Sequence, residues 1–159
     1  MNLLFKGASG FLGYNVLPLL KKKYSVETIG LTSQDDYIVN LAAEIPKLAG
    51  KYDVILHVAG KAHSLPKTEA EKRLFFDVNL QGTKNLCTAL EQSGIPKSFI
   101  FISTVAVYGC DSGENITEEY PLNGTTPYAL SKIKAEKYLE EWCAMHNVKL
   151  SILRPSLIA

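Results

Sequence analysis

The sequence lacks the features of a disulfide-stabilised, metal-binding or membrane protein. Its 159 residues include only three cysteines, Cys87, Cys110 and Cys143, an odd number whose spacing fits neither a disulfide framework nor a zinc site. The first residues lack the basic stretch and long apolar run of a signal peptide. No apolar run approaches the length that spans a bilayer. We therefore expect a cytoplasmic chain in a reducing compartment, with no metal and no membrane partner.

The chain also lacks an excess of charge of either sign. Lysine and arginine total 17 against 16 acidic residues, for a formal net charge of +1. The densest basic run, 21–23, falls at the end of a predicted helix, where cations are favoured by the helix dipole. A nucleic-acid partner is therefore not expected. The length fits one domain, over residues 1–159, that can bury a substantial core.

Short apolar runs alternate with helical patterns along the whole chain. Strands are predicted at 3–5, 26–31, 37–39, 54–58, 99–102 and 150–153, and helices at 11–22, 42–48, 68–92 and 127–146. A polar loop is predicted over 109–126. Alternating strands and helices predict an α/β fold with a doubly wound parallel sheet.

The chemically interesting residues follow strands. The glycine-rich stretch 7–13 follows the first strand, 59–63 follows the strand at 54–58, and Ser103 and Thr104 follow the strand at 99–102. Because ligands of such sheets bind over the carboxyl ends of the strands, these segments are expected to share one crevice.

Gly7, Gly10 and Gly13 have a spacing that is typical of a phosphate-binding turn. Glycines let the backbone approach a pyrophosphate, and the following helix offers free N–H groups at its start. On this motif alone, a strand-to-helix turn that binds nothing remains the alternative.

Tyr128 and Lys132 lie four residues apart, on one face of the helix predicted at 127–146. The apolar stripe of that face continues through Ala135 and Leu139, which favours a buried pair over a surface pair. An ammonium group near a phenol favours the phenolate by about two pKa units. Tyr128 is then a plausible acid/base for alcohol–ketone interconversion, and Thr104 is placed to hydrogen-bond the same substrate oxygen.

Taken together, the motifs resemble the extended short-chain dehydrogenase/reductase family, in its nucleotide-sugar epimerase and dehydratase branch. The stretches that carry the resemblance are Gly7-x-x-Gly10-x-x-Gly13, 57–60, 79–83, 103–109, 127–132 and Arg154-Pro155, in the family's order. The resemblance implies an NAD(P)-binding Rossmann fold, a nucleotide-sugar substrate, NAD as cofactor with NADP not excluded, and hydride transfer.

The resemblance also implies roles for single residues. The cofactor would contact Gly7, Gly10, Phe11, Leu12 and Gly13 at the pyrophosphate, Asn40 and Leu41 beside the adenine, Ala59, Gly60 and Lys61 after a strand, and Pro155 near the nicotinamide. Asn79 would hold the neighbouring loop. Thr104, Tyr128 and Lys132 would be catalytic, with Lys132 binding the nicotinamide ribose and lowering the pKa of Tyr128.

Two departures from the family pattern stand out. The region at the end of the second strand, 30–33, contains neither an acidic residue for the ribose hydroxyls nor an arginine for a 2′-phosphate. The choice between NAD and NADP is therefore open, and NAD is favoured only because no cation lies nearby. Members of the family run to roughly twice this length, and their second half builds the substrate pocket. The apolar ending at 156–159 is expected to reflect a truncated chain, whose isolated fragment is inactive.

Several functions fit these residues. The first is the cofactor-binding and catalytic half of an NAD(P)-dependent nucleotide-sugar epimerase or dehydratase. A 4-keto nucleotide-sugar reductase, with His63 near the substrate, is a second. A non-catalytic dinucleotide sensor and a small binding module are the others. The resemblance further implies a homodimer through the helices that contain Asn79 and Tyr128, and Leu130 and Tyr138 are compatible with that contact.

Overall fold

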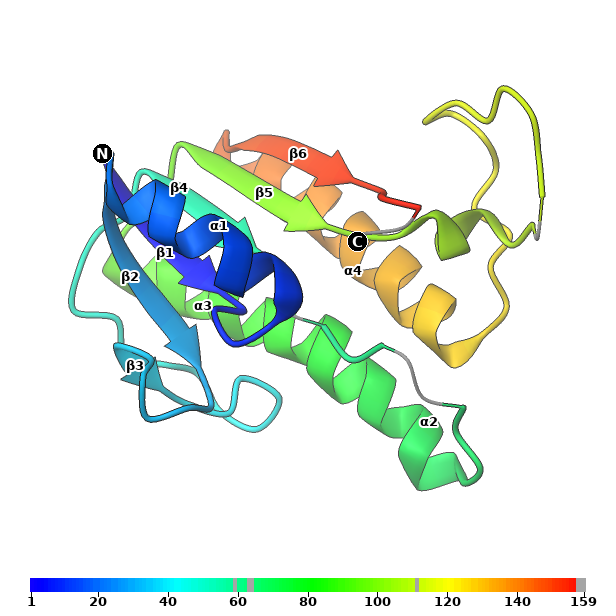
Figure 1. Ribbon diagram of the computed structural model, residues 1–159, viewed down its shortest axis with the longest axis horizontal. Coiled ribbons are helices and arrows are strands. Elements are labelled where there is room, and N and C mark those ends of the chain that lie inside the picture. The colour runs from blue at the N-terminus through cyan, green and yellow to red at the C-terminus, as the bar shows by residue number, and fades with distance from the viewer. Residues whose placement is uncertain (59, 63–64, 111, 157–159) are drawn as a thin grey trace.

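The computed structural model describes residues 1–58, 60–62, 65–110 and 112–156. These residues form a six-stranded sheet in which every adjacent pair of strands is parallel (Figure 1). The strands are β1 (Asn2–Lys6), β2 (Ser25–Gly30), β3 (Tyr37–Ile38), β4 (Val54–His57), β5 (Ser98–Ile102) and β6 (Lys149–Leu153). Their order is β3-β2-β1-β4-β5-β6. The predicted doubly wound parallel sheet is confirmed.

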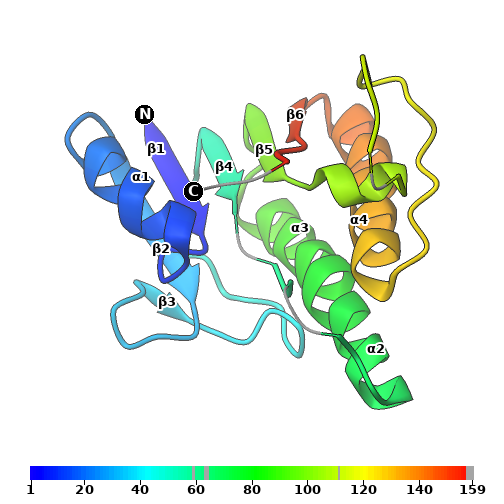
Figure 2. The ribbon, with the colours of Figure 1, turned by 45° about the vertical axis from the view of Figure 1, so that its right-hand side comes forward.

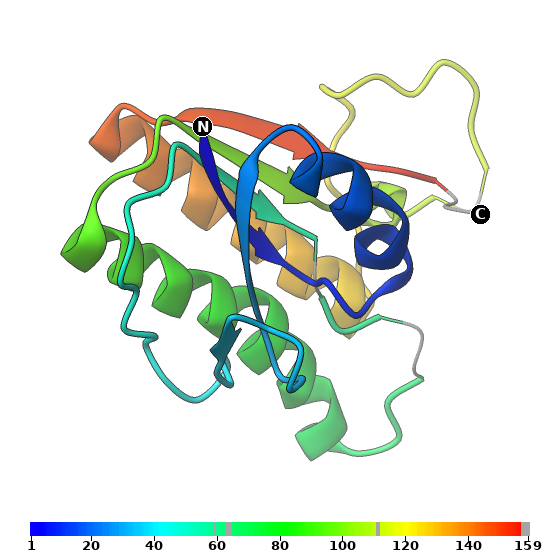
Figure 3. The ribbon, with the colours of Figure 1, turned by 60° about the vertical axis from the view of Figure 1, so that its left-hand side comes forward.

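Helices lie on both faces of the sheet. They are α1 (Phe11–Lys21), α2 (Glu69–Phe76), the π-helical turn η1 (Asp77–Gln81), α3 (Gly82–Ser93), the 3₁₀ turn η2 (Val105–Tyr108) and α4 (Pro127–His146). Figures 2 and 3 show α1 on one face, and α3 and α4 side by side on the other. The glycine turn follows the end of β1 and precedes α1, so it lies at the carboxyl edge of the sheet.

The core lies between the central strands and the layer of α3 and α4. Leu4, Ile55, Phe99 and Phe101 are fully buried, as expected for strands that pack against a layer of helices. Strand β6 differs, because none of its five residues is fully buried. The sheet around β5 and β6 is therefore less completely covered than the sheet around β1.

Helix α4 has the limits that the sequence predicts. The Thr126 side chain accepts a hydrogen bond from the N–H of Ala129 at 3.1 Å, and Pro127 occupies the first turn. Asn147 ends the helix in the left-handed conformation, with a φ of 55°. These local signals fix where Tyr128 and Lys132 lie on the helix.

Two expectations about helices need correction. The helix predicted at 42–48 is wrong, because the segment contains only one turn near Asn40, whose side chain accepts from the N–H of Ala42 at 3.2 Å. Pro46 explains the failure, since it has no N–H and disfavours helix in the residue before it. The helix predicted at 68–92 is present but is interrupted by η1, for which no local sequence signal exists.

Candidate functional site

The turn after β1 is built for close approach of a ligand to the backbone. Gly7 adopts a φ of 110°, and the N–H of Gly10 bonds its carbonyl at 3.2 Å. A Cβ placed on Gly13 would lie 2.1 Å from the Gly7 carbonyl oxygen, so only glycine lets α1 pack against the turn. No side chain of the described residues caps the start of α1. Its first N–H groups therefore face the turn as free donors.

A cavity of about 530 Å³ brings most of the sequence-predicted site residues together. Its lining includes Gly7, Gly10, Phe11, Leu12, Gly60, Thr104, Tyr128, Lys132 and Pro155. Gly13 does not line this cavity but lines an adjacent hollow of about 610 Å³. Segments that are distant in the sequence thus meet at the carboxyl ends of β1, β4 and β5, where ligands of such sheets bind.

A second cavity, of about 240 Å³, continues along the other side of the glycine turn. It shares Gly7, Ser9 and Gly60 with the first cavity and is also lined by Asn40, Leu41 and Lys61. Of the remaining predicted residues, Ala59 and His63 lie outside the described part of the chain. The two cavities form an elongated crevice across the edge of the sheet.

Lys132 is buried deep in the site. It is 3% exposed, its Nζ donates to the carbonyl oxygen of Ile102 at 2.8 Å, and it lies 4.5 Å from the centre of the Phe101 ring. Burial lowers the pKa of Lys132 to about 7, and the charge of Lys6 adds to the effect. Lys132 can therefore change its protonation state near neutral pH.

Tyr128 lies in the first turn of α4, with its ring centre 6.3 Å from that of Phe75. The expected lowering of the Tyr128 pKa by Lys132 is wrong for this structure. Burial raises the pKa of Tyr128, and a hydrogen bond from the Thr104 hydroxyl only partly offsets that effect. The physical reason is that desolvation of the buried phenol outweighs the hydrogen bond with Thr104, and the Lys132 charge makes no contribution to the shift.

Asn79 ties the loop after β4 to the helices. Its Oδ1 accepts from the N–H of Lys61 at 2.7 Å, and its Nδ2 donates to the Lys61 carbonyl at 3.1 Å and to Ser131 Oγ at 2.9 Å. A Cβ on Gly60 would lie 3.0 Å from Asn79 Oδ1 and 3.1 Å from Lys132 Nζ. The loop at Gly60 thus passes directly over Lys132. Asn79, which lies in the π turn η1, holds this loop through Lys61.

His57 belongs to the core rather than to the ligand crevice. It is fully buried, and its Nε2 lies 3.1 Å from Thr83 Oγ1, which in turn donates to the Asn79 carbonyl at 2.7 Å. Since the Thr83 proton is used in that bond, Nε2 is the donor to Thr83. Burial holds the pKa of His57 well below its ordinary value, with the charges of Lys6 and Lys132 adding to the effect.

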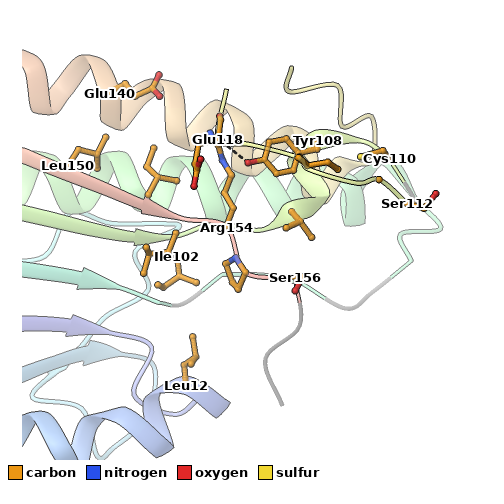
Figure 4. A pocket seen from close by; sticks show the side chains of 16 residues that line it. Leu12, Ile102, Tyr108, Cys110, Ser112, Glu118, Glu140, Leu150, Arg154 and Ser156 are labelled. Carbon is orange, nitrogen blue, oxygen red and sulfur yellow. Dashed lines mark hydrogen bonds between the residues drawn. The ribbon is translucent and has the colours of Figure 1, made fainter. Parts of the chain in front are cut away.

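A buried ion pair, which the sequence did not reveal, anchors the chain after β6. Arg154 donates to Glu136 through Nε at 3.2 Å and Nη2 at 2.7 Å, and through Nη1 to Tyr108 Oη at 3.1 Å and the Glu118 carbonyl at 2.9 Å. Figure 4 shows Arg154 reaching Tyr108 beside a cavity of about 1070 Å³. The pair fixes the start of the segment that carries Pro155 into the site.

A sequence model of the NAD dependent epimerase/dehydratase family matches residues 3–159. The chain belongs to this family. Among curated relatives, it is 33% identical to the N-acetyl-alpha-D-glucosaminyl-diphospho-ditrans,octacis-undecaprenol 4-epimerase of Escherichia coli O157:H7, over 99% of this chain and 49% of the relative. It is 30% identical to the UDP-glucose 4-epimerase of Vibrio cholerae, over 99% of this chain and 52% of that protein. The chain thus spans about half the length of these relatives.

Solved structures of the family share the fold. RMD from Pseudomonas aeruginosa, solved with NADPH, matches with a TM-score of 0.81 and 25% identity, over 98% of this chain and 53% of that one. The UDP-glucose 4-epimerase of Thermus thermophilus, solved with NAD, matches with a TM-score of 0.78 and 26% identity, over 97% and 54% of the two chains. The resemblance inferred from the motifs is confirmed, and relatives in this family are solved with either dinucleotide.

The described residues offer neither a metal centre nor a membrane span. They contain no group of three or more His, Cys, Asp or Glu side chains that could hold a metal ion. None of the helices in the same part of the chain is long and apolar enough to cross a membrane.

Proposed function

We propose that this chain provides the dinucleotide-binding and acid/base parts of an NAD(P)-dependent epimerase or dehydratase of nucleotide sugars. The observation that carries the proposal is the shared cavity of about 530 Å³. It places Thr104, Tyr128 and Lys132 on the same crevice as the glycine turn at Gly7 and Gly10. An acid/base group beside a dinucleotide-binding turn is what hydride transfer at an alcohol carbon requires.

The residues present fit a dinucleotide. The uncapped start of α1 offers free N–H donors to a pyrophosphate, and Gly10 leaves the approach open. Asn40 and Leu41 line the cavity that would take the adenine, whereas Lys132 and Pro155 line the cavity that would take the nicotinamide. The nicotinamide, when bound, supplies or accepts the hydride.

Tyr128 would move the proton that accompanies hydride transfer. Since burial raises its pKa, the hydroxyl is protonated at neutral pH and can donate to the oxygen of a keto-sugar. In the opposite direction the phenolate, formed once the hydroxyl has given up its proton, would take the proton of a sugar hydroxyl, and Thr104 would hydrogen-bond the same oxygen. Lys132, whose pKa is about 7, would bind the nicotinamide ribose, as the resemblance implies.

Oxidation followed by reduction on the opposite face gives an epimerase, whereas a single reduction gives a 4-keto-sugar reductase. The second candidate is supported by 27% identity to the GDP-6-deoxy-D-mannose reductase of Pseudomonas aeruginosa, over 96% of this chain and 51% of that protein. A non-catalytic dinucleotide sensor is less favoured, because Tyr128, Lys132 and Thr104 are all present and converge on one cavity.

We also propose a homodimer in a reducing, cytoplasmic compartment. Helix α4 carries Leu130, which is 38% exposed, and Tyr138, which is partly buried against the core. Cys87, Cys110 and Cys143 are all free thiols, which suits a reducing environment. Light scattering on the full-length protein tests the dimer, and a monomeric mass at micromolar concentration would contradict it.

The enzymatic proposal is tested by incubating the full-length protein with NAD or NADPH and a panel of UDP-, dTDP- and GDP-sugars. An epimerase interconverts two sugars without net change in NADH, a dehydratase releases a 4-keto-6-deoxy sugar, and a reductase consumes NADPH in proportion to a keto-sugar. Dinucleotide binding without conversion of any sugar in the panel would favour the sensor instead.

A further inference from the structure

The carboxyl end of β2 carries no acidic side chain in the sequence, yet a carboxylate lies there in space. Gly30 is the last residue of β2. A Cβ placed on Gly30 would lie 2.5 Å from Asp35 Oδ2 and 3.0 Å from Asp35 Oδ1. Asp35, which comes from the loop between β2 and β3, therefore fills the space that a side chain on residue 30 would need. Glycine at position 30 makes that placement possible.

One oxygen of the Asp35 carboxylate is held by hydrogen bonds, whereas the other has no hydrogen-bond donor among the described residues. Its Oδ2 accepts from the N–H of Thr32 at 3.0 Å and from Thr32 Oγ1 at 2.7 Å. Asp35 is only 7% exposed, and its Oδ1 is buried with no hydrogen-bond partner among the described residues. A buried carboxylate oxygen without a donor is rare and indicates that a donor from elsewhere completes the arrangement.

The missing donor can come from the ligand crevice. Asp35 lines the cavity of about 240 Å³ together with Gly30, Leu31, Asn40 and the glycine-turn residue Gly7. In dinucleotide-binding sheets, a carboxylate at the end of the second strand hydrogen-bonds the adenosine ribose, and its charge disfavours a 2′-phosphate at the same place.

We propose that Asp35 accepts a hydrogen bond from the 2′-hydroxyl of the adenosine ribose and makes this site selective for NAD over NADP. The inference rests on the proposed dinucleotide-binding function. Membership of the family does not decide the choice, because one relative is solved with NADPH and another with NAD. Sequence reasoning missed Asp35 because it considered only 30–33, whereas the loop folds back over Gly30.

A cation nearby provides the competing possibility. Lys21 lines an adjacent hollow of about 610 Å³ with Thr32, Ser33 and Asp35. If Lys21 bound a 2′-phosphate, the wild-type protein would prefer NADP. The wild-type preference alone therefore discriminates between the two arrangements.

The test is calorimetric titration of the full-length protein with NAD, NADP and an NAD analogue that lacks the 2′-hydroxyl of the adenosine ribose. We expect wild type to bind NAD at least tenfold more tightly than either of the other two, because a hydrogen bond to a charged group is lost in both cases. In Asp35→Asn, NAD affinity falls about tenfold and the preference over NADP largely disappears.

Asp36→Asn is the matched control. It makes the same change in charge at the neighbouring residue, whose Oδ2 accepts from the N–H of Thr28 at 2.7 Å instead of lining the cavity. Its NAD-to-NADP ratio should equal that of wild type. Equal or tighter binding of NADP by wild type, or an unchanged ratio in Asp35→Asn, would overturn the inference while leaving the proposed function intact. Binding of neither dinucleotide would overturn both.

Discussion

Asn79 holds both main-chain polar groups of Lys61, accepting from its N–H at 2.7 Å and donating to its carbonyl at 3.1 Å. Asn79 lies in the π turn η1 and is 1% exposed. The Asn79 side chain thus pairs with both main-chain groups of Lys61, as the backbone of a neighbouring strand would. One buried amide therefore sets the backbone that lines both parts of the ligand crevice.

Replacing Asn79 by alanine should leave the Lys61 N–H and carbonyl without partners in a buried setting. We expect the free energy of unfolding to fall by about 2–3 kcal/mol, as for other unsatisfied buried groups. NAD affinity should fall as well, because the loop at 60–61 loses its support. Urea denaturation and NAD titration measure the two effects. Asn15→Ala, which removes an exposed asparagine whose Nδ2 donates to the Phe11 carbonyl, should change neither. A stable, NAD-binding Asn79→Ala protein would contradict this role.

Two glycines of the turn have different roles: Gly13 allows close packing of the backbone, and Gly10 lines the ligand cavity. A Cβ on Gly13 would lie 2.1 Å from the Gly7 carbonyl oxygen and 2.5 Å from that of Ala8, whereas a Cβ on Gly10 would lie at an ordinary 3.5 Å from the Gly7 oxygen. Gly13→Ala should therefore destabilise the fold by a few kcal/mol, as overpacking does. Gly10→Ala should keep its thermal midpoint but lose NAD affinity, because its methyl group enters the cavity. Equal thermal midpoints for the two variants would contradict this division.

The ion pair between Arg154 and Glu136 is buried, with side chains 13% and 1% exposed. Glu136→Gln leaves the guanidinium without its counter-charge, so we expect a loss of about 3–5 kcal/mol in the free energy of unfolding. Lys72→Met removes an exposed pair with Glu69 and should leave denaturation unchanged. A Glu136→Gln protein as stable as wild type would show that the pair does not hold the end of β6.

The depressed pKa of Lys132 makes stability depend on pH. The folded value is about 7 against 10.5 in the unfolded chain, so between these values the unfolded state binds more protons. Stability should then rise as pH increases from about 7 towards 10.5, by on the order of 1 kcal/mol per pH unit. Lys6, whose pKa burial lowers to about 8, contributes in the upper part of the same window.

Lys132→Met should remove that part of the pH dependence that begins near pH 7. Urea denaturation of wild type and variant at several values between about pH 6 and 10 isolates it, because Lys6 is common to both proteins. A variant with the wild-type slope would show that Lys132 is not desolvated in the folded protein.

Much of the fold was predictable because local signals and the global pattern agree. Thr126, Pro127 and Asn147 set the limits of α4 by capping chemistry, and the apolar runs at β4 and β5 indicated buried parallel strands. The segment 42–48 misled, since its apolar content suggested a helix that Pro46 prevents. The π turn at Asp77–Gln81 depends on long-range contacts of Asn79, which no local pattern encodes.

The convergence of the candidate residues on one cavity was predictable from the sequence, but their electrostatics were not. Glycine spacing and the Tyr128–Lys132 interval identified residues that line one cavity. The pKa direction of Tyr128 was predicted wrongly, because it is set by burial of the phenol, which depends on how other elements pack over the ring. Asp35 was missed for a similar reason, because only the folded loop brings it to Gly30.

The central claim is that the Tyr128 hydroxyl moves the substrate proton. The most direct measurement is the single-turnover rate at which the full-length protein, loaded with NAD, forms NADH from its nucleotide sugar, in wild type and Tyr128→Phe. The variant keeps the ring that packs against Phe75 and should keep its affinity for NAD. We predict a rate about 10²–10⁴-fold lower, the usual contribution of a general acid or base. A rate near that of wild type with NAD affinity intact would contradict the account.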